Sequence, residues 1–120
     1  MAKKEEGCPG NEAECKKHLL ALRDSMEILS GKWKIPIILA LWYGNFRFKE
    51  LLRQIEGITP RMLSKELKEL ETNKLVTRTV YDTIPVSVEY ALTPYSKSLQ
   101  SVIMELGKWG EQHRKVIIGK

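Results

Sequence analysis

The sequence predicts a mainly α-helical fold with a small β-hairpin. A helix-sized segment covers residues 48–56, a glycine-containing turn covers 57–60, and a second helix-sized segment covers 60–73. Two runs rich in β-branched and aromatic residues follow at 75–81 and 86–92, which is typical of a hairpin. This order predicts a winged helix-turn-helix, in which the hairpin is the wing, and therefore a DNA-binding protein.

Length and composition predict one ordinary globular domain. The chain has 120 residues, of which 42% are hydrophobic and 29% are charged, and this length suits a single domain. We expect a flexible arm over residues 1–10 and one domain over residues 11–120. The longest apolar run, Ile35 to Tyr43, is far shorter than the roughly 20 residues that cross a bilayer, and the N-terminus lacks an apolar signal region. We therefore expect a cytoplasmic protein without membrane contact.

The positive charge is concentrated in the predicted helix-turn-helix. Residues 1–31 carry five Lys or Arg against six Asp or Glu, residues 32–80 carry ten against five, and residues 81–120 carry five against four. A localised basic excess is what binding to the DNA phosphates requires. Charge alone fits a solvated surface equally well.

Two helices are predicted before the helix-turn-helix. Asn11 is a suitable N-cap for a helix over 11–30, whose apolar residues repeat at three- and four-residue steps. A second, largely apolar helix is expected over 34–43, because Pro36 is tolerated in a first turn. Phe46 and Arg47 are expected to form a very short strand.

The second helix of the pair is the predicted recognition helix. Thr59 offers a capping hydroxyl and Pro60 fits the first helical position. At 100° per residue, three leucines cluster on one side. The opposite side carries basic and hydroxylated residues that suit the major groove. The buried set is Leu63, Leu67 and Leu70, the outer set is Arg61, Ser64, Lys65, Lys68 and Thr72, and Glu66, Glu69 and Glu71 lie on the flanks.

The expected DNA contacts outside this helix are fewer. Arg78 is the only cation of the hairpin, whose tip, residues 82–85, has none. Lys32 and Lys34, at the start of the second predicted helix, are candidates for phosphate contact, although they could equally be solvated charges. Thr59 completes the predicted DNA-contacting set.

Thr93 and Pro94 repeat the cap-plus-proline signal and open a predicted last helix over 94–117. Its apolar residues step by four and three, a heptad-like seam. We expect this helix and helix 11–30 to pair with their counterparts in a two-fold homodimer that reads an inverted-repeat operator. The alternative is a last helix that packs only within its own chain. The residues expected at the dimer interface are Leu19, Leu22, Met26, Leu99, Val102, Leu106, Trp109 and His113.

Other classes of function find little support. No Ser/His/Asp, Cys/His/Asn or phosphate-loop arrangement is present, and Cys8 and Cys15 lack zinc-finger spacing. We expect no catalytic residue, no metal site and no cofactor, and free thiols in a reducing cytosol. The remaining alternative is a winged helix that binds an acidic protein partner instead of DNA.

Several tracts in a fixed order resemble the HxlR-type branch of winged-helix transcriptional regulators, which are related to the MarR group. They are Cys8-Pro9, Gly31-Lys32-Trp33-Lys34, Arg47-Phe48-Lys49-Glu50-Leu51, Gly57-Ile58-Thr59 with Met62-Leu63, Leu67-Lys68-Glu69-Leu70-Glu71, Val88-Glu89-Tyr90 with Leu92-Thr93, and Trp109-Gly110.

The resemblance implies a dimeric DNA-binding regulator with the helix from Pro60 for recognition. Ser87 stands where the family often has arginine, two residues after the wing proline, which implies weaker wing contacts. In several members the thiol that matches Cys8 senses oxidants or electrophiles, so Cys8 is a candidate redox sensor. An inert thiol and an unidentified small-molecule effector are alternatives that the residues leave open.

Overall fold

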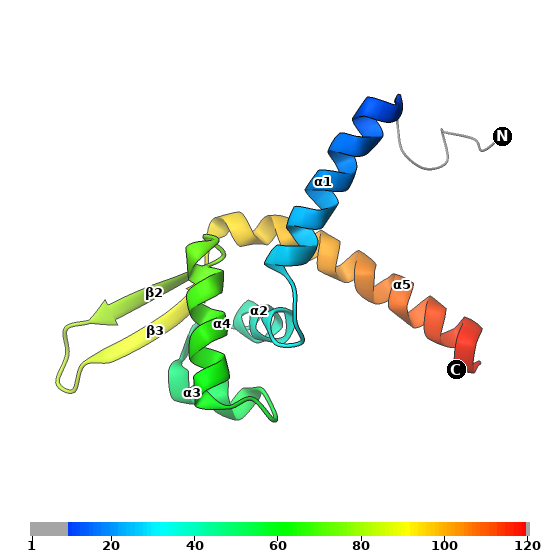
Figure 1. The fold of residues 1–120 in the computed structure, drawn as a ribbon. Coiled ribbons are helices and arrows are strands. Elements are labelled where there is room, and N and C mark those ends of the chain that lie inside the picture. The colour runs from blue at the N-terminus through cyan, green and yellow to red at the C-terminus, as the bar shows by residue number, and fades with distance from the viewer. Residues whose placement is uncertain (1–9, 120) are drawn as a thin grey trace. The chain divides into compact units, whose positions relative to one another are not determined.

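The computed structural model describes residues 10–119, which form helices and one small sheet (Figure 1). The chain divides into two compact units, Met1–Gly31 and Lys32–Lys120. In chain order the elements are α1 (Glu12–Ile28), α2 (Lys34–Trp42), β1 (Phe46–Arg47), α3 (Phe48–Gln54), α4 (Pro60–Thr72), β2 (Val76–Tyr81), β3 (Ser87–Leu92), the 3-10 helix η2 (Pro94–Leu99) and α5 (Gln100–Ile118). The predicted fold class, mainly α with a small β-hairpin in a winged helix-turn-helix, is confirmed.

The first unit contains α1, and its start follows the predicted cap. The side-chain oxygen of Asn11 accepts from the backbone N–H of Glu14 at 3.0 Å, and the Glu14 carboxylate accepts from the Asn11 N–H at 3.2 Å. This reciprocal capping box satisfies two N–H groups that no helical carbonyl reaches. No residue of α1 is buried.

The core of the second unit lies between α2, α3, α4 and the base of the hairpin. Most of the side chains that solvent hardly reaches are aliphatic, and they include the three leucines that periodicity placed on the inner side of α4. The most deeply buried are Ile37, Ile38, Leu51, Leu63, Leu67, Leu70 and Val76.

The sheet has three antiparallel strands in the order β1-β3-β2. β3 pairs with β2 along its whole length, from Val76 opposite Leu92 to Tyr81 opposite Ser87. The short strand β1, predicted at Phe46 and Arg47, pairs with the other edge of β3, with Arg47 opposite Glu89. Because α3 begins directly after β1, this pairing fixes the start of α3 beside the wing.

Helix α4 ends in a Schellman motif. The N–H of Leu75 donates to the carbonyl of Leu70 and that of Lys74 to the carbonyl of Glu71, both at 3.0 Å. Lys74 occupies the left-handed position with φ of 63°, where glycine is usual. The chain therefore turns from α4 into β2 within three residues.

The segment after the wing differs from the prediction of one continuous helix. Thr93 caps it as expected, since its hydroxyl accepts from the Ser96 N–H at 3.1 Å. Residues 94–99 nevertheless form the 3-10 helix η2, and α-helical geometry begins at Gln100. The hydroxyls of Ser96 and Ser98 donate to carbonyls three residues earlier, both at 2.7 Å. Such bonds compete with the α-helical ladder and favour the tighter turn.

Candidate nucleic-acid interface

The start of α4 is fixed by the residues that sequence reasoning identified. The Thr59 hydroxyl accepts from the Met62 N–H at 3.1 Å, and Pro60 occupies the first helical position. The preceding turn contains Gly57 with φ of +89°, a left-handed conformation that favours glycine. These features set the angle at which α4 leaves the turn.

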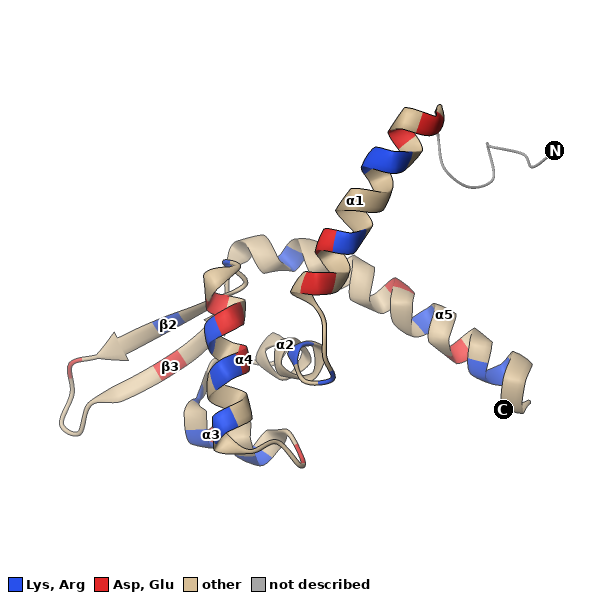
Figure 2. Cartoon of the chain, in the orientation of Figure 1, with Lys and Arg blue, Asp and Glu red and all other residues tan. Residues whose placement is uncertain are grey.

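The outer face of α4 is basic and hydroxylated. Burial of the three leucines turns the opposite side of the helix to solvent. Figure 2 shows blue Lys and Arg bands along α4, with red Glu bands among them. The Thr72 hydroxyl is used within the helix, where it donates to the Lys68 carbonyl at 2.9 Å. The exposed residues of this face that were predicted to contact DNA are Arg61, Ser64, Lys65 and Lys68.

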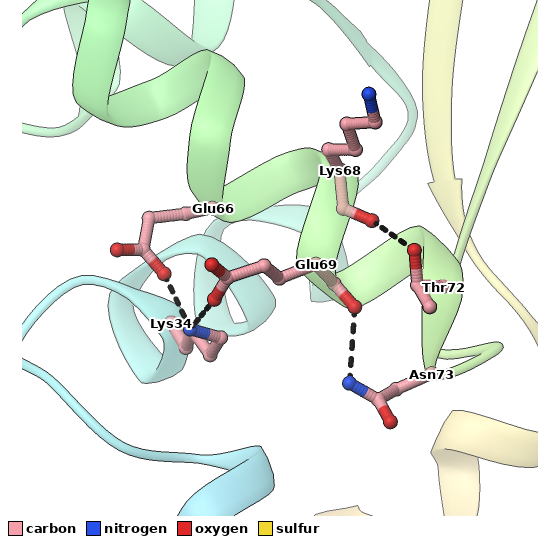
Figure 3. A network of polar contacts seen from close by, with 6 residues as sticks. All are labelled: Lys34, Glu66, Lys68, Glu69, Thr72 and Asn73. Carbon is pink, nitrogen blue, oxygen red and sulfur yellow. Dashed lines mark hydrogen bonds and ion pairs between the residues drawn. The ribbon is translucent and has the colours of Figure 1, made fainter.

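The structure corrects the expectation for Lys34. This residue is only 4% exposed, and its ammonium bonds Glu66 at 2.6 Å and Glu69 at 2.5 Å (Figure 3). It faces the inner side of α4, whereas Lys68 points away from the cluster. Two carboxylates hold the charge inside the protein, so Lys34 is not available to a DNA phosphate. Its side chain joins the start of α2 to α4.

Contacts within the cluster of Lys34, Glu66 and Glu69 shift the pKa values of Lys34 and Glu69. Burial lowers the pKa of Lys34, but the hydrogen bonds and charges of the two glutamates outweigh burial, so its pKa lies above the ordinary value. The hydrogen bond from Lys34, followed by its charge, holds the pKa of Glu69 below the ordinary value. Both shifts favour the charged forms, so the ion pair between Lys34 and Glu69 persists near neutral pH.

The three other residues that were predicted to contact DNA are all exposed. Arg78 is exposed on β2, opposite Tyr90. Lys32 is exposed, with its ammonium 4.9 Å from the centre of the Trp33 ring, a cation–π contact. Thr59 is exposed as well, although its hydroxyl already caps α4.

The wing has an apolar tip. Between β2 and β3 the side chain of Ile84 is fully exposed, and Val86 is also exposed. Next to the tip, the hydroxyl of Tyr81 on β2 donates to the carboxylate of Glu89 on β3 at 3.1 Å, which raises the pKa of Tyr81. The tip therefore offers apolar groups and Asp82 to a partner, in agreement with the prediction that it carries no cation.

Sequence reasoning missed a second group of cations, at the end of β1 and on α3. Arg47, Lys49 and Arg53 line a hollow whose other side is the wing tip. Lys49 and Arg53 are exposed on α3, and nothing local in the sequence indicated that they face the wing. The two-residue strand β1 is the signal that could have revealed this, because its pairing with β3 brings α3 to the hairpin.

Apolar side chains are exposed on α1 and, separately, on α5. On α1 these include Leu19, Leu22 and Met26, and on α5 they include Val102, Leu106 and Trp109. The ring of His113 stacks on Trp109 with centroids 4.9 Å apart and an interplanar angle of 9°. Leu99, expected in the same helical seam, lies instead in η2 and is half-buried.

One of the two cysteines differs from the expected free thiol. Cys15, on α1, is disulfide-bonded and is not the free thiol that the sequence predicted. Residue spacing does not determine the redox state of a thiol, which depends on geometry and on the potential of the surroundings. Cys8, the candidate sensor, lies outside the described residues.

Within residues 10–119 no helix is long and apolar enough to cross a membrane. In the same part of the chain, no three His, Cys, Asp or Glu side chains gather where they could hold a metal ion.

Comparisons with known proteins agree with this geometry. A family model described as HxlR-like helix-turn-helix matches residues 28–117. YtcD, a helix-turn-helix-type transcriptional regulator of Bacillus subtilis, is 37% identical over 106 residues, which is 88% of this chain and 84% of YtcD.

Two solved structures of regulators are similar to the chain. The reduced form of YodB from B. subtilis has a TM-score of 0.72 at 38% identity, covering 77% of this chain and 90% of that one. The redox regulator HypR in its reduced form has a TM-score of 0.75 at 34% identity, covering 83% and 99%. YodB has also been solved after diamide treatment, and HypR in its oxidised form.

The fold, the exposed basic face of α4 and these relatives define a transcriptional regulator of the winged helix-turn-helix class, which acts by binding DNA. The chain belongs to the HxlR-like helix-turn-helix family. The family resemblance is therefore confirmed. Since the family consists of regulators, the prediction that the protein is not an enzyme is confirmed too.

Proposed function

We propose that this chain acts in the cytoplasm as a homodimer that binds an inverted-repeat operator in double-stranded DNA. The observation that carries the proposal is the outer face of α4, where Arg61, Ser64, Lys65 and Lys68 are exposed above three buried leucines. Arginine and lysine donate to guanine edges and to phosphates, and serine hydroxyls accept or donate as the base requires. Two such helices related by a two-fold axis read half-sites about 34–36 Å apart.

The exposed side chains of α5 support the homodimer. Trp109 is 63% exposed, and Val102 and Leu106 repeat on the same helix. Leaving a row of large apolar groups in water is unfavourable, and a second copy offers a matching row. Replacing Trp109 with glutamate should shift sedimentation from dimer to monomer and weaken binding to the full inverted repeat far more than to one half-site. An unchanged dimer would count against α5 as the interface.

The DNA contact is tested on an operator selected from genomic fragments with the purified protein. Arg61→Ala should cost about 1–3 kcal/mol of binding and relax the base preference at one position, whereas Lys68→Ala should weaken all sequences about equally. Lys97→Ala, a change of an exposed lysine in η2, is the control and should leave binding unchanged. If Arg61→Ala and Lys68→Ala both bind the operator like the unaltered protein, α4 is not the reading helix.

A salt series distinguishes DNA binding from the alternative function, which is binding to an acidic protein. Specific DNA binding should weaken steeply as salt rises and should favour one inverted repeat over random duplex. Binding that ignores sequence would support the alternative.

We also propose that Cys8 makes operator binding sensitive to oxidants or electrophiles. The support is the likeness to YodB and HypR, which have been solved in reduced and in treated or oxidised forms. When two thiols join as a disulfide they release two electrons and two protons, and diamide accepts both.

The test begins with reduced protein and adds diamide. Operator affinity should change, and Cys8→Ser should abolish the change. Mass spectrometry without reductant identifies the second thiol, either Cys15 or Cys8 of a second copy. A Cys8→Ser protein that responds like the original excludes Cys8 as the sensor.

A further inference from the structure

Helix α4 has no net charge of its own. Its thirteen residues include three cations and three carboxylates, which are Arg61, Lys65, Lys68, Glu66, Glu69 and Glu71. A helix with no net charge gains little from DNA phosphates unless its carboxylates are neutralised or kept away from its cations. The charge that α4 offers to DNA therefore depends on what holds its glutamates.

Lys34 neutralises carboxylates of α4 from the inner side of the helix. Its ammonium bonds Glu66 at 2.6 Å and Glu69 at 2.5 Å, and the residue is only 4% exposed. It belongs to the start of α2 and not to α4 itself. Lys34 therefore adds a positive charge beneath α4 that cannot move to a phosphate.

Glu69 lies beside a cation of the outer face. Its side chain is 45% exposed, against 12% for Glu66, and Lys65 precedes it by four residues, which makes the two neighbours on the helix surface. The pKa of Glu69 is low chiefly because of the hydrogen bond and the charge of Lys34, and the charge of Lys65 adds to this. Lys65 is exposed and forms no ion pair with another residue between 10 and 119. Lys34 thus occupies the carboxylate that Lys65 would otherwise bind.

We propose that Lys34 is a positioning residue for DNA binding, which holds Glu69 away from Lys65 and so leaves Lys65 free for the operator. When Lys34 is removed, the released carboxylate of Glu69 bonds Lys65 and repels the nearby phosphates. Lys68 is unaffected, because it points away from the cluster (Figure 3). The two carboxylates thereby have separate roles, since stability depends on the buried Glu66 and DNA binding on Glu69. This inference rests on the proposed function.

The test measures operator affinity and its salt dependence in Lys34→Met. Withdrawing one lysine from the DNA should lower the slope of log affinity against log salt by about 0.9, which is about an eightfold loss of affinity at 0.1 M salt. Lys65→Ala should weaken the original protein about eightfold but the Lys34→Met protein less than about twofold, because Lys65 is already withdrawn there. Lys68→Ala, the matched control, should weaken both proteins by the same factor.

Two second-site changes distinguish this role from a purely structural one. Glu69→Gln should strengthen binding about eightfold in the Lys34→Met protein and less than about twofold in the original, although the contact between α2 and α4 stays broken. Glu66→Met should restore the free energy of unfolding of Lys34→Met but not its operator affinity. The stability-restored protein with both changes serves as the background for Lys65→Ala and Glu69→Gln if Lys34→Met alone does not fold.

The outcomes separate this inference from the proposed function. A folded Lys34→Met protein that binds the operator with the original affinity and slope overturns the inference. Equal effects of Glu69→Gln in both backgrounds also overturn it, since the broken contact between α2 and α4 then accounts for the loss. In either case, operator binding that is still sensitive to Arg61→Ala leaves the proposed function standing. Absence of operator binding by the original protein removes both.

Discussion

Replacing Lys34 with methionine tests whether the buried cluster holds α4 in place. The change removes an ammonium that bonds Glu66 at 2.6 Å and Glu69 at 2.5 Å, and it keeps most of the aliphatic stem. Loss of packing is therefore small. The main effect is electrostatic, because Glu66, with a side chain only 12% exposed, loses its cation.

The size of the effect follows from burial. Breaking a fully buried ion pair by removing one partner costs about 3–5 kcal/mol, because the other charge stays buried without compensation. Here Glu66 lies close to the surface and Glu69 is 45% exposed, so water can solvate part of the remaining charge. We expect Lys34→Met to lower the free energy of unfolding by about 2–3 kcal/mol.

The assay is urea unfolding at one fixed protein concentration, since dimerisation makes stability depend on concentration. Lys65→Met, on the exposed face of α4, is the matched control and should change stability by less than about 0.5 kcal/mol. Adding Glu66→Met to Lys34→Met should restore most of the loss, because it removes the uncompensated charge. A loss below about 0.5 kcal/mol for Lys34→Met, the size of an exposed pair, would refute the reasoning.

Three further changes test single features. The pKa of Glu69 is lowered in the folded state, so Glu69 contributes fully to the free energy of unfolding above its unfolded pKa of about 4.3, and this contribution is lost as pH falls through the folded pKa. Glu69→Gln should therefore make the free energy of unfolding depend less on pH below about pH 5, as measured by circular dichroism. Lys74→Gly should raise the free energy of unfolding by about 0.5–1 kcal/mol, and with it the urea midpoint, because glycine adopts the left-handed conformation without strain. A lower midpoint would contradict this. Thr59→Ala should cost about 1 kcal/mol through the lost cap of α4, with Thr59→Ser close to the original in the same unfolding assay.

Local signals were enough to predict the helix-turn-helix. The cap at Thr59, the proline after it and the spacing of Leu63, Leu67 and Leu70 each act within one or two helical turns. The hairpin was likewise predictable from two β-type runs separated by a short connection. These features depend on neighbours in sequence, and the structure has them where they were expected.

The interactions that were missed join residues far apart in sequence. Lys34 was expected to contact a phosphate or to be a solvated charge, because its partners Glu66 and Glu69 are more than thirty positions away and looked like flank residues of α4. The α3 cations face the wing through a two-residue strand pairing. Neither arrangement leaves a periodic pattern, so both required the three-dimensional structure.

The division of α4 into an inner and an outer side bears on how such a regulator changes its target. On the inner side, the three leucines and the carboxylates that bond Lys34 tie the helix to the rest of its unit. Arg61, Ser64 and Lys65 on the outer side are exposed, and substitutions at such positions usually alter stability by less than about 0.5 kcal/mol. Under the proposed function, operator preference and folding are therefore encoded by separate positions of one thirteen-residue helix. A library that varies only the outer positions should yield regulators with new operators and unchanged stability.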